Sequence, residues 1–418
     1  MRTLLVTGPG GAGRTTVAAA TAVQAARRGV RTLLLATDRT DTVGAALGTP
    51  TGPRPVTPAP GLTVLRPDPA AGLSAALRAL RQRAASVLDL LGSAPLDDAA
   101  TVLPGGPELA LLRALREAAT GPYALVVVDL PATTDAIETL TLPARLRRYL
   151  RRLLPPQRQA ARALRPLLGR LAGVPVPPEG LYETVARWDE ELAGVQGVIE
   201  DPATTVRLVA EPGESGAEAV RTAVLGLALH GLRMDALVAN RLLPPAAADP
   251  WLAPIVAAQR KTLDDWGAWL AARDGAGLPG HPDARLYGVD HLGREPRGRD
   301  DLVALAAGTA APDPASPTVP GLPADPVDCA PPAPGWPVVD RRATDGLLVW
   351  HVPVPGARRT ELDLVRHGDE LAVTAGPFHR VVDLPSALRR CTVDGAGLTD
   401  DELRIRFRPD PALWPTSG

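Results

Sequence analysis

Cysteine, lysine, asparagine and aromatic residues are scarce in this sequence. Its 418 residues include 2 cysteines, Lys261 as the one lysine and Asn240 as the one asparagine, and aromatic side chains make up 3%. Cys329 and Cys391 are far apart, so they provide neither a disulfide framework nor the cluster of thiolates that zinc or a soft metal requires. We therefore expect a protein of a reducing compartment without a thiol-based metal site.

Long apolar runs and an excess charge of one sign are also missing. No stretch approaches the roughly 20 apolar residues that cross a bilayer, and the first residues read as a core strand rather than a signal peptide. The formal net charge is -1, which gives no reason to expect nucleic acid as a partner. These absences favour a cytoplasmic protein, and the length leaves room for two or three domains.

A glycine-rich loop follows the first apolar segment. Residues 8–16 read GPGGAGRTT and lie between apolar residues 3–7 and an Ala/Val-rich helical stretch at 14–28. The spacing is that of a phosphate-binding loop, except that Arg14 stands where lysine is expected. Backbone N–H groups of such a loop and the following helix N-terminus bind phosphate, and Thr15 is placed to hold Mg²⁺. A purely structural turn could contain the same glycines. The rest of the chain has to decide between a phosphate-binding loop and a structural turn.

The remaining pattern predicts an α/β fold with a doubly wound, mostly parallel sheet. Continuous apolar runs suit strands that are buried on both faces of such a sheet. The expected strands are 3–7, 30–36, 124–128, 206–210 and 234–239, and the expected helical stretches are 14–28, 70–119 and 215–230. An arginine-rich helical insert at about 144–200 interrupts the pattern. The α/β pattern ends near residue 308, so we expect the first domain to span residues 1–308.

The C-terminal part differs in composition. Residues 309–337 are dense in Pro and Ala with little periodicity, which is typical of an extended linker. Residues 338–418 contain short alternating segments, such as 347–352 and 370–374, separated by Gly and Pro turns. This pattern predicts a small β-sandwich domain.

Two acidic positions follow expected strands. Asp38 comes after the second strand and could orient a water beside the γ-phosphate. Helix N-capping by Asp38 or Asp41 is an equally good interpretation of that turn. Asp129 ends the apolar run at 124–128, where a carboxylate could support a magnesium ion opposite Thr15 through water.

These motifs together resemble the ArsA-type ATPases, the family of the arsenical-pump and tail-anchored-protein-targeting ATPases. GPGGAGRTT is similar to the family loop GKGGVGKTT, and residues 38–42 and 129–135 stand where the family has its switch motifs DPAHS and DTAPTGH. Glu211-Pro212 resembles the family's E-P helix, residues 238–244 its adenine loop, and residues 295–298 its E-P-x-G segment. Residues 348–407 resemble the small-heat-shock-protein-like domain that is fused to some ArsA-like proteins.

The resemblance implies a P-loop NTPase that binds ATP and Mg²⁺. The implied nucleotide-binding residues are Gly8, Gly10, Gly11, Ala12, Gly13, Arg14, Thr15, Thr16, Asn240 and Arg241. Asp38 and Arg14 would be catalytic, and Thr15 and Asp129 would hold the metal, the latter through water. The family also implies a homodimer and a client protein or membrane-associated partner.

The sequence departs from the family where hydrolysis is concerned. Pro9 replaces the lysine that reaches the partner's nucleotide, and the fork of Arg14 is no simple substitute for an ammonium. Thr134 and Asp135 replace a glycine and a histidine, and Asp41 replaces another histidine. Two hypotheses remain: a slow ATPase that couples nucleotide state to a partner, and a pseudo-ATPase scaffold that binds partners through its β domain.

Two features of known relatives lack a counterpart. No C-x-x-C motif or thiol cluster is present, so we expect binding of neither zinc nor arsenite through thiols. In the insert, an apolar helix face is conceivable, but interspersed arginines favour a solvated helix or one that meets acidic lipids or partners. The apolar positions are Leu146, Tyr149, Leu150, Leu153 and Leu154, and the basic ones are Arg147, Arg148, Arg151 and Arg152.

Overall fold

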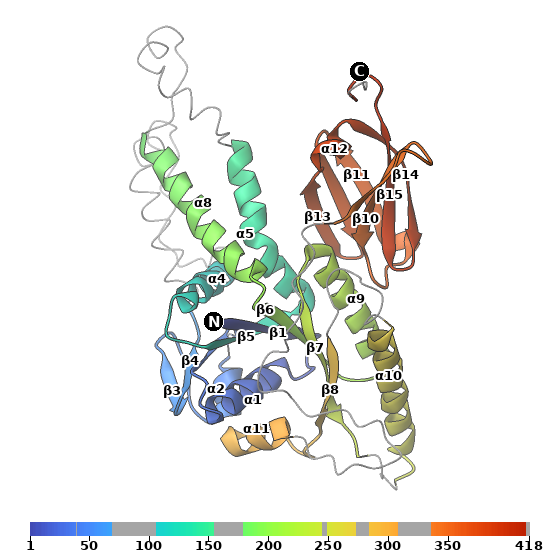
Figure 1. Cartoon of the computed structure of the whole chain (residues 1–418). Coiled ribbons are helices and arrows are strands. Elements are labelled where there is room, and N and C mark those ends of the chain that lie inside the picture. The colour runs from blue at the N-terminus through green and yellow to red at the C-terminus, as the bar shows by residue number, and fades with distance from the viewer. Residues whose placement is uncertain are drawn as a thin grey trace, which may run out of the picture.

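The N-terminal part of the chain folds into a sheet with helices on both faces (Figure 1). The computed structural model describes residues 1–38, 40–68, 106–153, 179–244, 249–272, 284–307 and 336–414. The sheet has eight strands in the order β3-β4-β2-β5-β1-β6-β7-β8, and its neighbouring strands are parallel except for the β3–β4 pair. The prediction of a doubly wound, mostly parallel sheet of the P-loop NTPase type is confirmed.

The strands of this sheet are β1 (Arg2–Gly8), β2 (Thr32–Ala36), β3 (Val56–Ala59), β4 (Leu62–Leu65), β5 (Leu125–Ala132), β6 (Thr204–Ala210), β7 (Met234–Leu242) and β8 (Arg285–Asp290). The helices around it are α1 (Arg14–Arg27), α2 (Thr42–Leu47), α4 (Gly106–Ala119), α5 (Thr133–Leu153), α8 (Glu179–Glu200), α9 (Glu214–His230), α10 (Ala253–Ala271) and α11 (Gly298–Ala307).

Each strand buries side chains on both faces of the sheet, which explains the continuous apolar runs. Leu4 and Val6 of β1 pack with α1, α2 and α11, whereas Leu5 between them packs with α5 and α9 on the other face. Apolar burial of this kind contributes about 25 cal/mol per Å². The two apolar clusters therefore fix β1 in the middle of the sheet, where its carboxyl end carries the glycine-rich loop.

Some expected elements differ in extent. The strand expected at 30–36 begins at Thr32, and the helical stretch expected at 70–119 includes α4, while residues 69–105 lie outside the described part. The β3–β4 hairpin and β8 are strands that the sequence pattern did not predict. Both are edge elements, and β3 is only partly buried, so neither has the uninterrupted apolar run of a central strand.

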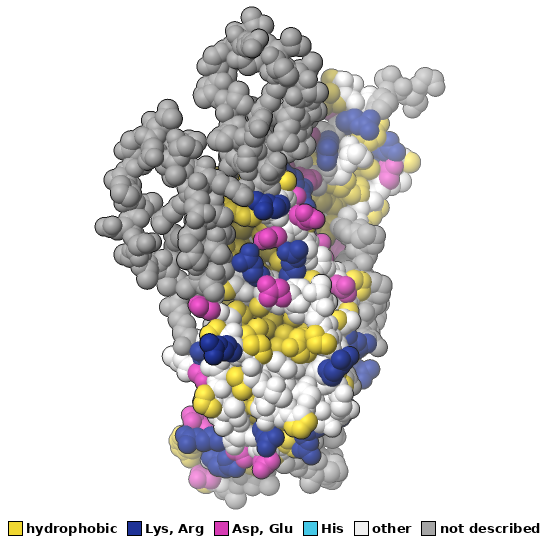
Figure 2. Space-filling view, turned by 90° about the vertical axis from the view of Figure 1, so that its left-hand side faces the viewer, with side chains coloured by type: hydrophobic (Ala, Val, Ile, Leu, Met, Phe, Trp, Pro, Cys, Tyr) yellow, Lys and Arg dark blue, Asp and Glu magenta, His cyan; other side chains and the backbone are white. Residues whose placement is uncertain are grey.

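Helices α5 and α8 extend side by side away from the sheet (Figure 1). Arg147 on α5 donates to Asp189 on α8 over 2.9 Å, so this arginine does not simply face solvent. On the face seen in Figure 2, basic and acidic side chains are interspersed over this region. Leu154 lies outside the described residues, as does the side chain of Leu153. Within the described residues, no helix is long and apolar enough to cross a membrane.

The C-terminal domain consists of two antiparallel sheets, as predicted for a β sandwich. Its strands are β9 (Val338–Arg341), β10 (Leu347–Pro353), β11 (Leu362–His367), β12 (Glu370–Ala375), β13 (Phe378–Asp383), β14 (Cys391–Thr399) and β15 (Glu402–Pro409), with η2 (Arg359–Glu361) and α12 (Ser386–Arg389) in between. One sheet has the order β14-β15-β10-β9 and the other β11-β12-β13. Phe407 and Trp350 are buried between them.

Candidate functional site

The glycine-rich loop at the carboxyl end of β1 has a shape that depends on its glycines. A Cβ atom at Gly8 would lie 1.9 Å from the carbonyl oxygen of Val209, and one at Gly13 would lie 2.1 Å from Nδ2 of Asn240. Gly11 and Gly13 have φ values of 78° and 87°, a region that L side chains rarely adopt. The loop therefore packs tightly against β6 and β7 on one side, while Gly10 and Gly11 are exposed on the other.

The loop ends at the N-terminus of α1, which has no side-chain cap and no acidic residue in its first turn. The first four backbone N–H groups of a helix have no intrahelical acceptor and carry partial positive charge. Thr15 and Thr16 lie in this turn and are partly exposed. The geometry supplies donors for an anion at the open side of the loop.

Thr15 and Asp129 meet beside the loop. The hydroxyl of Thr15 donates to Oδ2 of Asp129 over 2.7 Å, and the hydroxyl of Thr37 donates to the backbone carbonyl of Asp129 over 3.1 Å. Asp129 is only 4% exposed. Burial raises the pKa of its carboxyl group to about 6, against the opposing effects of the Thr15 hydrogen bond and the Arg14 charge. A buried carboxylate of this kind would be stabilised by a cation beside it.

A magnesium ion fits this donor set. Within the described residues, no group of three or more His, Cys, Asp or Glu side chains could hold a metal. Mg²⁺ does not require such a cage, because it retains waters and takes its other ligands from a hydroxyl, a carboxylate and substrate phosphates. The hydroxyl of Thr15 and the carboxylate of Asp129 are the residues that would serve it here.

Arg14 reaches toward the end of β5. Its Nη1 donates to the backbone carbonyl of Leu130 over 3.3 Å. Burial lowers the pKa of this guanidinium, whereas the charges of Asp129 and Asp135 act in the opposite direction. The negative charges of Asp129 and Asp135 therefore favour the charged form of Arg14 at this position.

Asp38 and Asp41 share the turn after β2. Asp41 is the N-cap of α2, with φ of 57°, and accepts hydrogen bonds from the N–H groups of Gly44 at 3.1 Å and Thr51 at 2.9 Å. Asp38 accepts the N–H of Thr42 through Oδ2, while its buried Oδ1 has no hydrogen-bond partner. The capping interpretation holds for Asp41, and Asp38 keeps one oxygen available.

Arg66 is a residue of this region that the sequence motifs did not reveal. Its Nη1 lies 3.2 Å from Asp41 and 3.7 Å from Asp38. It therefore offsets the negative charge of Asp41. The sequence signal that could have identified Arg66 is its position directly after β4. Because β4 is parallel to β2, both strands end at the same edge of the sheet.

Asn240 and Arg241 lie at the end of β7. Nδ2 of Asn240 donates to the backbone carbonyl of Ala12 over 2.7 Å, so this side chain braces the glycine-rich loop. Arg241 lies 3.3 Å from Glu211 in an ion pair, which joins the segment resembling the adenine loop to the one resembling the E-P helix. Gln259 accepts from the N–H of Leu243 and thereby holds this strand end.

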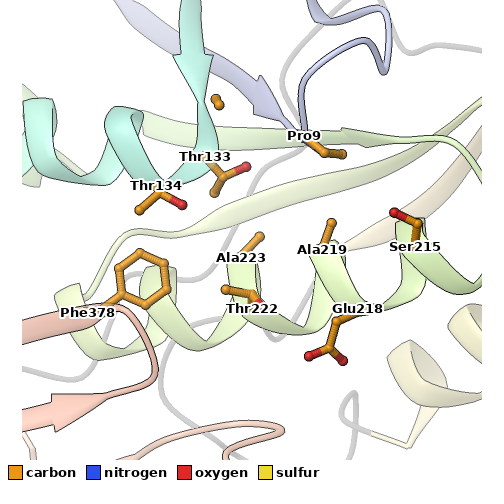
Figure 3. A pocket seen from close by; sticks show the side chains of 10 residues that line it. Pro9, Thr133, Thr134, Ser215, Glu218, Ala219, Thr222, Ala223 and Phe378 are labelled. Carbon is orange, nitrogen blue, oxygen red and sulfur yellow. The ribbon is translucent and has the colours of Figure 1, made fainter. Parts of the chain in front are cut away.

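A pocket of about 430 Å³ opens next to Pro9. Figure 3 shows Pro9, Thr133 and Thr134 on one side of it and the α9 side chains, among them Ala219, on the other. Phe378 of the C-terminal domain lies at one end of the same pocket. The hydroxyl of Thr133 is buried here without a hydrogen-bond partner. The glycine-rich loop and the start of α5 thus meet α9 at this pocket.

Comparison with known proteins agrees with this architecture. A family model described as anion-transporting ATPase matches residues 1–267, and a model described as an HSP20-like domain found in ArsA matches residues 345–407. An uncharacterized protein of Streptomyces coelicolor is 61% identical, covering 99% of both chains. A protein of Mycobacterium tuberculosis is 33% identical, covering 99% of this chain and 98% of its own. A putative arsenical pump-driving ATPase of Aquifex aeolicus is 23% identical, covering 97% and 99%.

The matches extend over the loop, the strand ends and the C-terminal sandwich alike. The chain belongs to the anion-transporting ATPase family, the ArsA-type ATPases, and carries the HSP20-like domain found in members of that family.

Proposed function

We propose that this protein binds Mg–ATP at residues 8–16, hydrolyses it slowly and couples its nucleotide state to a partner. The observation that carries the proposal is the 2.7 Å hydrogen bond between Thr15 and Asp129 beside an exposed, glycine-shaped loop at a helix N-terminus. Asp38, with its unpartnered oxygen, would position the attacking water. A cytoplasmic homodimer is the assembly we expect, by family resemblance.

The domain limits remain part of the proposal. We assign residues 1–308 to the ATPase domain with its helical insert at about 144–200, residues 309–337 to a linker, and residues 338–418 to the β domain. The described strands and helices on either side of residues 308–335 support this division.

Titration of the purified full chain with Mg–ATP, followed by measurement of phosphate release, tests the proposal. We expect saturable binding that Thr15→Ala weakens by about tenfold, because the loss of a charge-assisted ligand costs on the order of 1–2 kcal/mol. Thr15→Ser, which retains the hydroxyl at the same position, is the matched control. Absence of binding by the unaltered protein would overturn the proposal.

The pseudo-ATPase hypothesis is favoured by one observation. Arg14 donates to the Leu130 carbonyl, so part of its hydrogen-bonding capacity is used within the protein. Restoring both family lysines, in Pro9→Lys with Arg14→Lys, separates the two hypotheses. We expect the double variant to raise the rate of phosphate release. Unchanged release with intact ATP binding would support the pseudo-ATPase, because the altered switch at 133–135 would then limit hydrolysis.

A further inference from the structure

The C-terminal domain is docked on α9 of the ATPase domain (Figure 1), and side chains of α5 also reach it. Phe378 lies over Gly226, where an added Cβ would be 2.5 Å from the phenyl ring and 2.6 Å from Cδ1 of Ile137. The three residues come from β13, α9 and α5. The ring also meets His230 edge to face, with centroids 6.4 Å apart. Buried residues of both domains belong to one continuous apolar cluster, so the interface between the domains is packed like a protein core.

Arginines surround this apolar centre on the side of α9. Arg221 donates to the Gly356 carbonyl over 2.7 Å and to Glu361 over 3.1 Å. Arg358 returns across the interface to Glu218 over 3.0 Å. The four side chains alternate in charge and join the first half of α9 to η2. Such a network fixes the orientation of the docked domain more than it adds stability.

The far ends of both helices are held as well. Arg380 donates to the Leu229 carbonyl at the C-terminus of α9, where a cation is favourable. Arg148 on α5 donates to the Val381 carbonyl, and Arg152 pairs with Glu370. Two of the arginines for which the sequence suggested solvent, acidic lipids or partners, Arg148 and Arg152, therefore contact the protein's own β domain.

Both helices lead directly from this interface to the candidate nucleotide site. Helix α5 begins at Thr133, four residues after Asp129, without an intervening loop. Helix α9 faces Pro9 and the first turn of α5 across the pocket of Figure 3. Phe378 closes one end of this pocket, and the buried hydroxyl of Thr133 lies in its wall. A shift of the β domain would therefore move the switch segment, since packed helices move as units.

We propose that docking of the β domain on α5 and α9 supports ATP binding at the nucleotide site. Phe378 is a positioning residue: it holds α5 and α9 so that the switch segment 129–135 accepts the γ-phosphate of ATP. The inference rests on the proposed function. Docking and ATP binding are then thermodynamically linked, so each strengthens the other by the same factor. Because the switch senses the γ-phosphate, ADP binding is coupled to docking much more weakly.

Two variants on the docking face test this linkage in the full chain. Phe378→Ala removes the ring from the Gly226 contact, and Glu361→Arg places a positive charge against Arg221 and Arg358. Asp394→Arg is the matched control, because Asp394 pairs with Arg408 inside the β domain. Affinities for a non-hydrolysable ATP analogue and for ADP are measured by titration with Mg²⁺. Circular dichroism confirms that each variant is folded.

We expect both docking variants to lose about tenfold in affinity for the ATP analogue and less than twofold for ADP. The control should match the unaltered protein for both nucleotides. In hydrogen exchange, the ATP analogue should slow exchange of residues 376–383 in the unaltered protein, and Phe378→Ala should abolish this effect.

Equal losses for ATP analogue and ADP would overturn the inference, because they indicate a merely structural role for the interface. Unchanged affinities in both docking variants would overturn it as well, while leaving the proposed function intact. Failure of the unaltered protein to bind either nucleotide would instead reject the proposed function and, with it, the linkage.

Discussion

At the scale of single residues, the site depends on two side chains that are 114 positions apart in the chain. Thr15 and Asp129 form a 2.7 Å hydrogen bond because β1 and β5 are parallel neighbours whose carboxyl ends coincide, with Val6 paired to Asp129. Burial of Asp129 costs stability whenever the carboxyl group is ionised. Carboxyl groups with a raised pKa of this kind are typical of functional sites.

Asp129→Asn should separate the effect of this carboxyl group on stability from its proposed role in magnesium binding. The pKa of Asp129 is raised to about 6 in the folded protein, so the folded state retains a proton that the unfolded chain releases between about pH 4 and 6. The free energy of unfolding therefore declines as pH rises through this interval. At pH 7.5 we expect the nucleotide-free variant to be more stable, by on the order of 1 kcal/mol. Denaturant unfolding measures this difference.

The same variant should lose the stabilisation that Mg–ATP gives to the unaltered protein, because asparagine brings no charge to the metal. Thermal unfolding with Mg–ATP and with ATP plus a chelator provides the comparison. Full retention of the magnesium-dependent increment in Asp129→Asn would place the metal elsewhere.

Asn240 is the second residue whose role can be resolved. The family resemblance assigns it to adenine, while its Nδ2 donates to the Ala12 carbonyl and lies against Gly13. We expect Asn240→Ala to weaken ATP and GTP binding by a similar factor, about tenfold, because the loss of a buried hydrogen bond loosens the loop for any nucleotide. Parallel titrations with both nucleotides measure it. A loss confined to ATP would instead establish base reading as its main task.

At the scale of elements, α5 and α9 connect the loop edge to the β domain. The sequence pattern of α5 indicated a solvated basic helix, but Arg148 and Arg152 contact the β domain and Arg147 contacts α8. Tyr149, one of the apolar positions of this helix, is 61% exposed, so it is not part of a packed apolar face. Periodicity could not reveal these partners, since it reports which residues share a face and not what covers that face.

His230 at the end of α9 makes this junction sensitive to acid. Burial, together with Arg380, Arg145 and His379, lowers the pKa of His230 to about 3. Between about pH 6.5 and 3 the unfolded chain binds a proton that the folded protein does not, so the free energy of unfolding falls as pH falls. We expect this residue to account for a loss of about 1–2 kcal/mol between pH 7.5 and 5.

His230→Gln should make the free energy of unfolding less dependent on pH over that range. Denaturant unfolding of both proteins at pH 7.5, 6 and 5 measures the difference, and carboxylates that titrate in both proteins cancel. Identical pH profiles would show that His230 is solvated in the folded protein.

At the scale of the whole molecule, the ATPase sheet and the β sandwich form one packed unit through their shared apolar cluster. Relatives named as arsenical pump-driving ATPases raise the question of metalloid binding. Cys391 is 3% exposed, its thiol donates to the Ala387 carbonyl over 3.3 Å, and burial raises its pKa. Cys329 lies outside the described residues.

We expect arsenite and antimonite to leave Mg–ATP affinity and phosphate release unchanged. A soft metalloid site needs several thiolates around one ion, and a chain with two distant cysteines lacks them. Cys329→Ser with Cys391→Ser should therefore have no effect on either measurement. Metalloid stimulation that this double variant abolishes would contradict the prediction and favour a pump-driving role.

The sequence by itself determined where the glycine-rich loop, the strand-end carboxylate and the central strands lie. The spacing of the glycines identified the loop at 8–16, and the apolar runs identified the central strands, because both features depend on neighbouring residues. The position of Asp129 at a strand end placed it near the loop, because parallel strands end at one edge of the sheet. The capping alternative at Asp41 was also foreseen from the residue type.

Only the tertiary structure decided which distant residues meet. Arg66 beside Asp41, Asn240 against Gly13 and Phe378 over Gly226 are contacts between segments that no local pattern links. The local sequence pattern around an arginine on a helix does not show whether its side chain faces water or a docked domain, because the neighbouring residues are the same in both cases. The packing of the β domain on α5 and α9 answers that question, since the contact of Phe378 with Gly226 and the alternating charges beside it exist only in the folded chain.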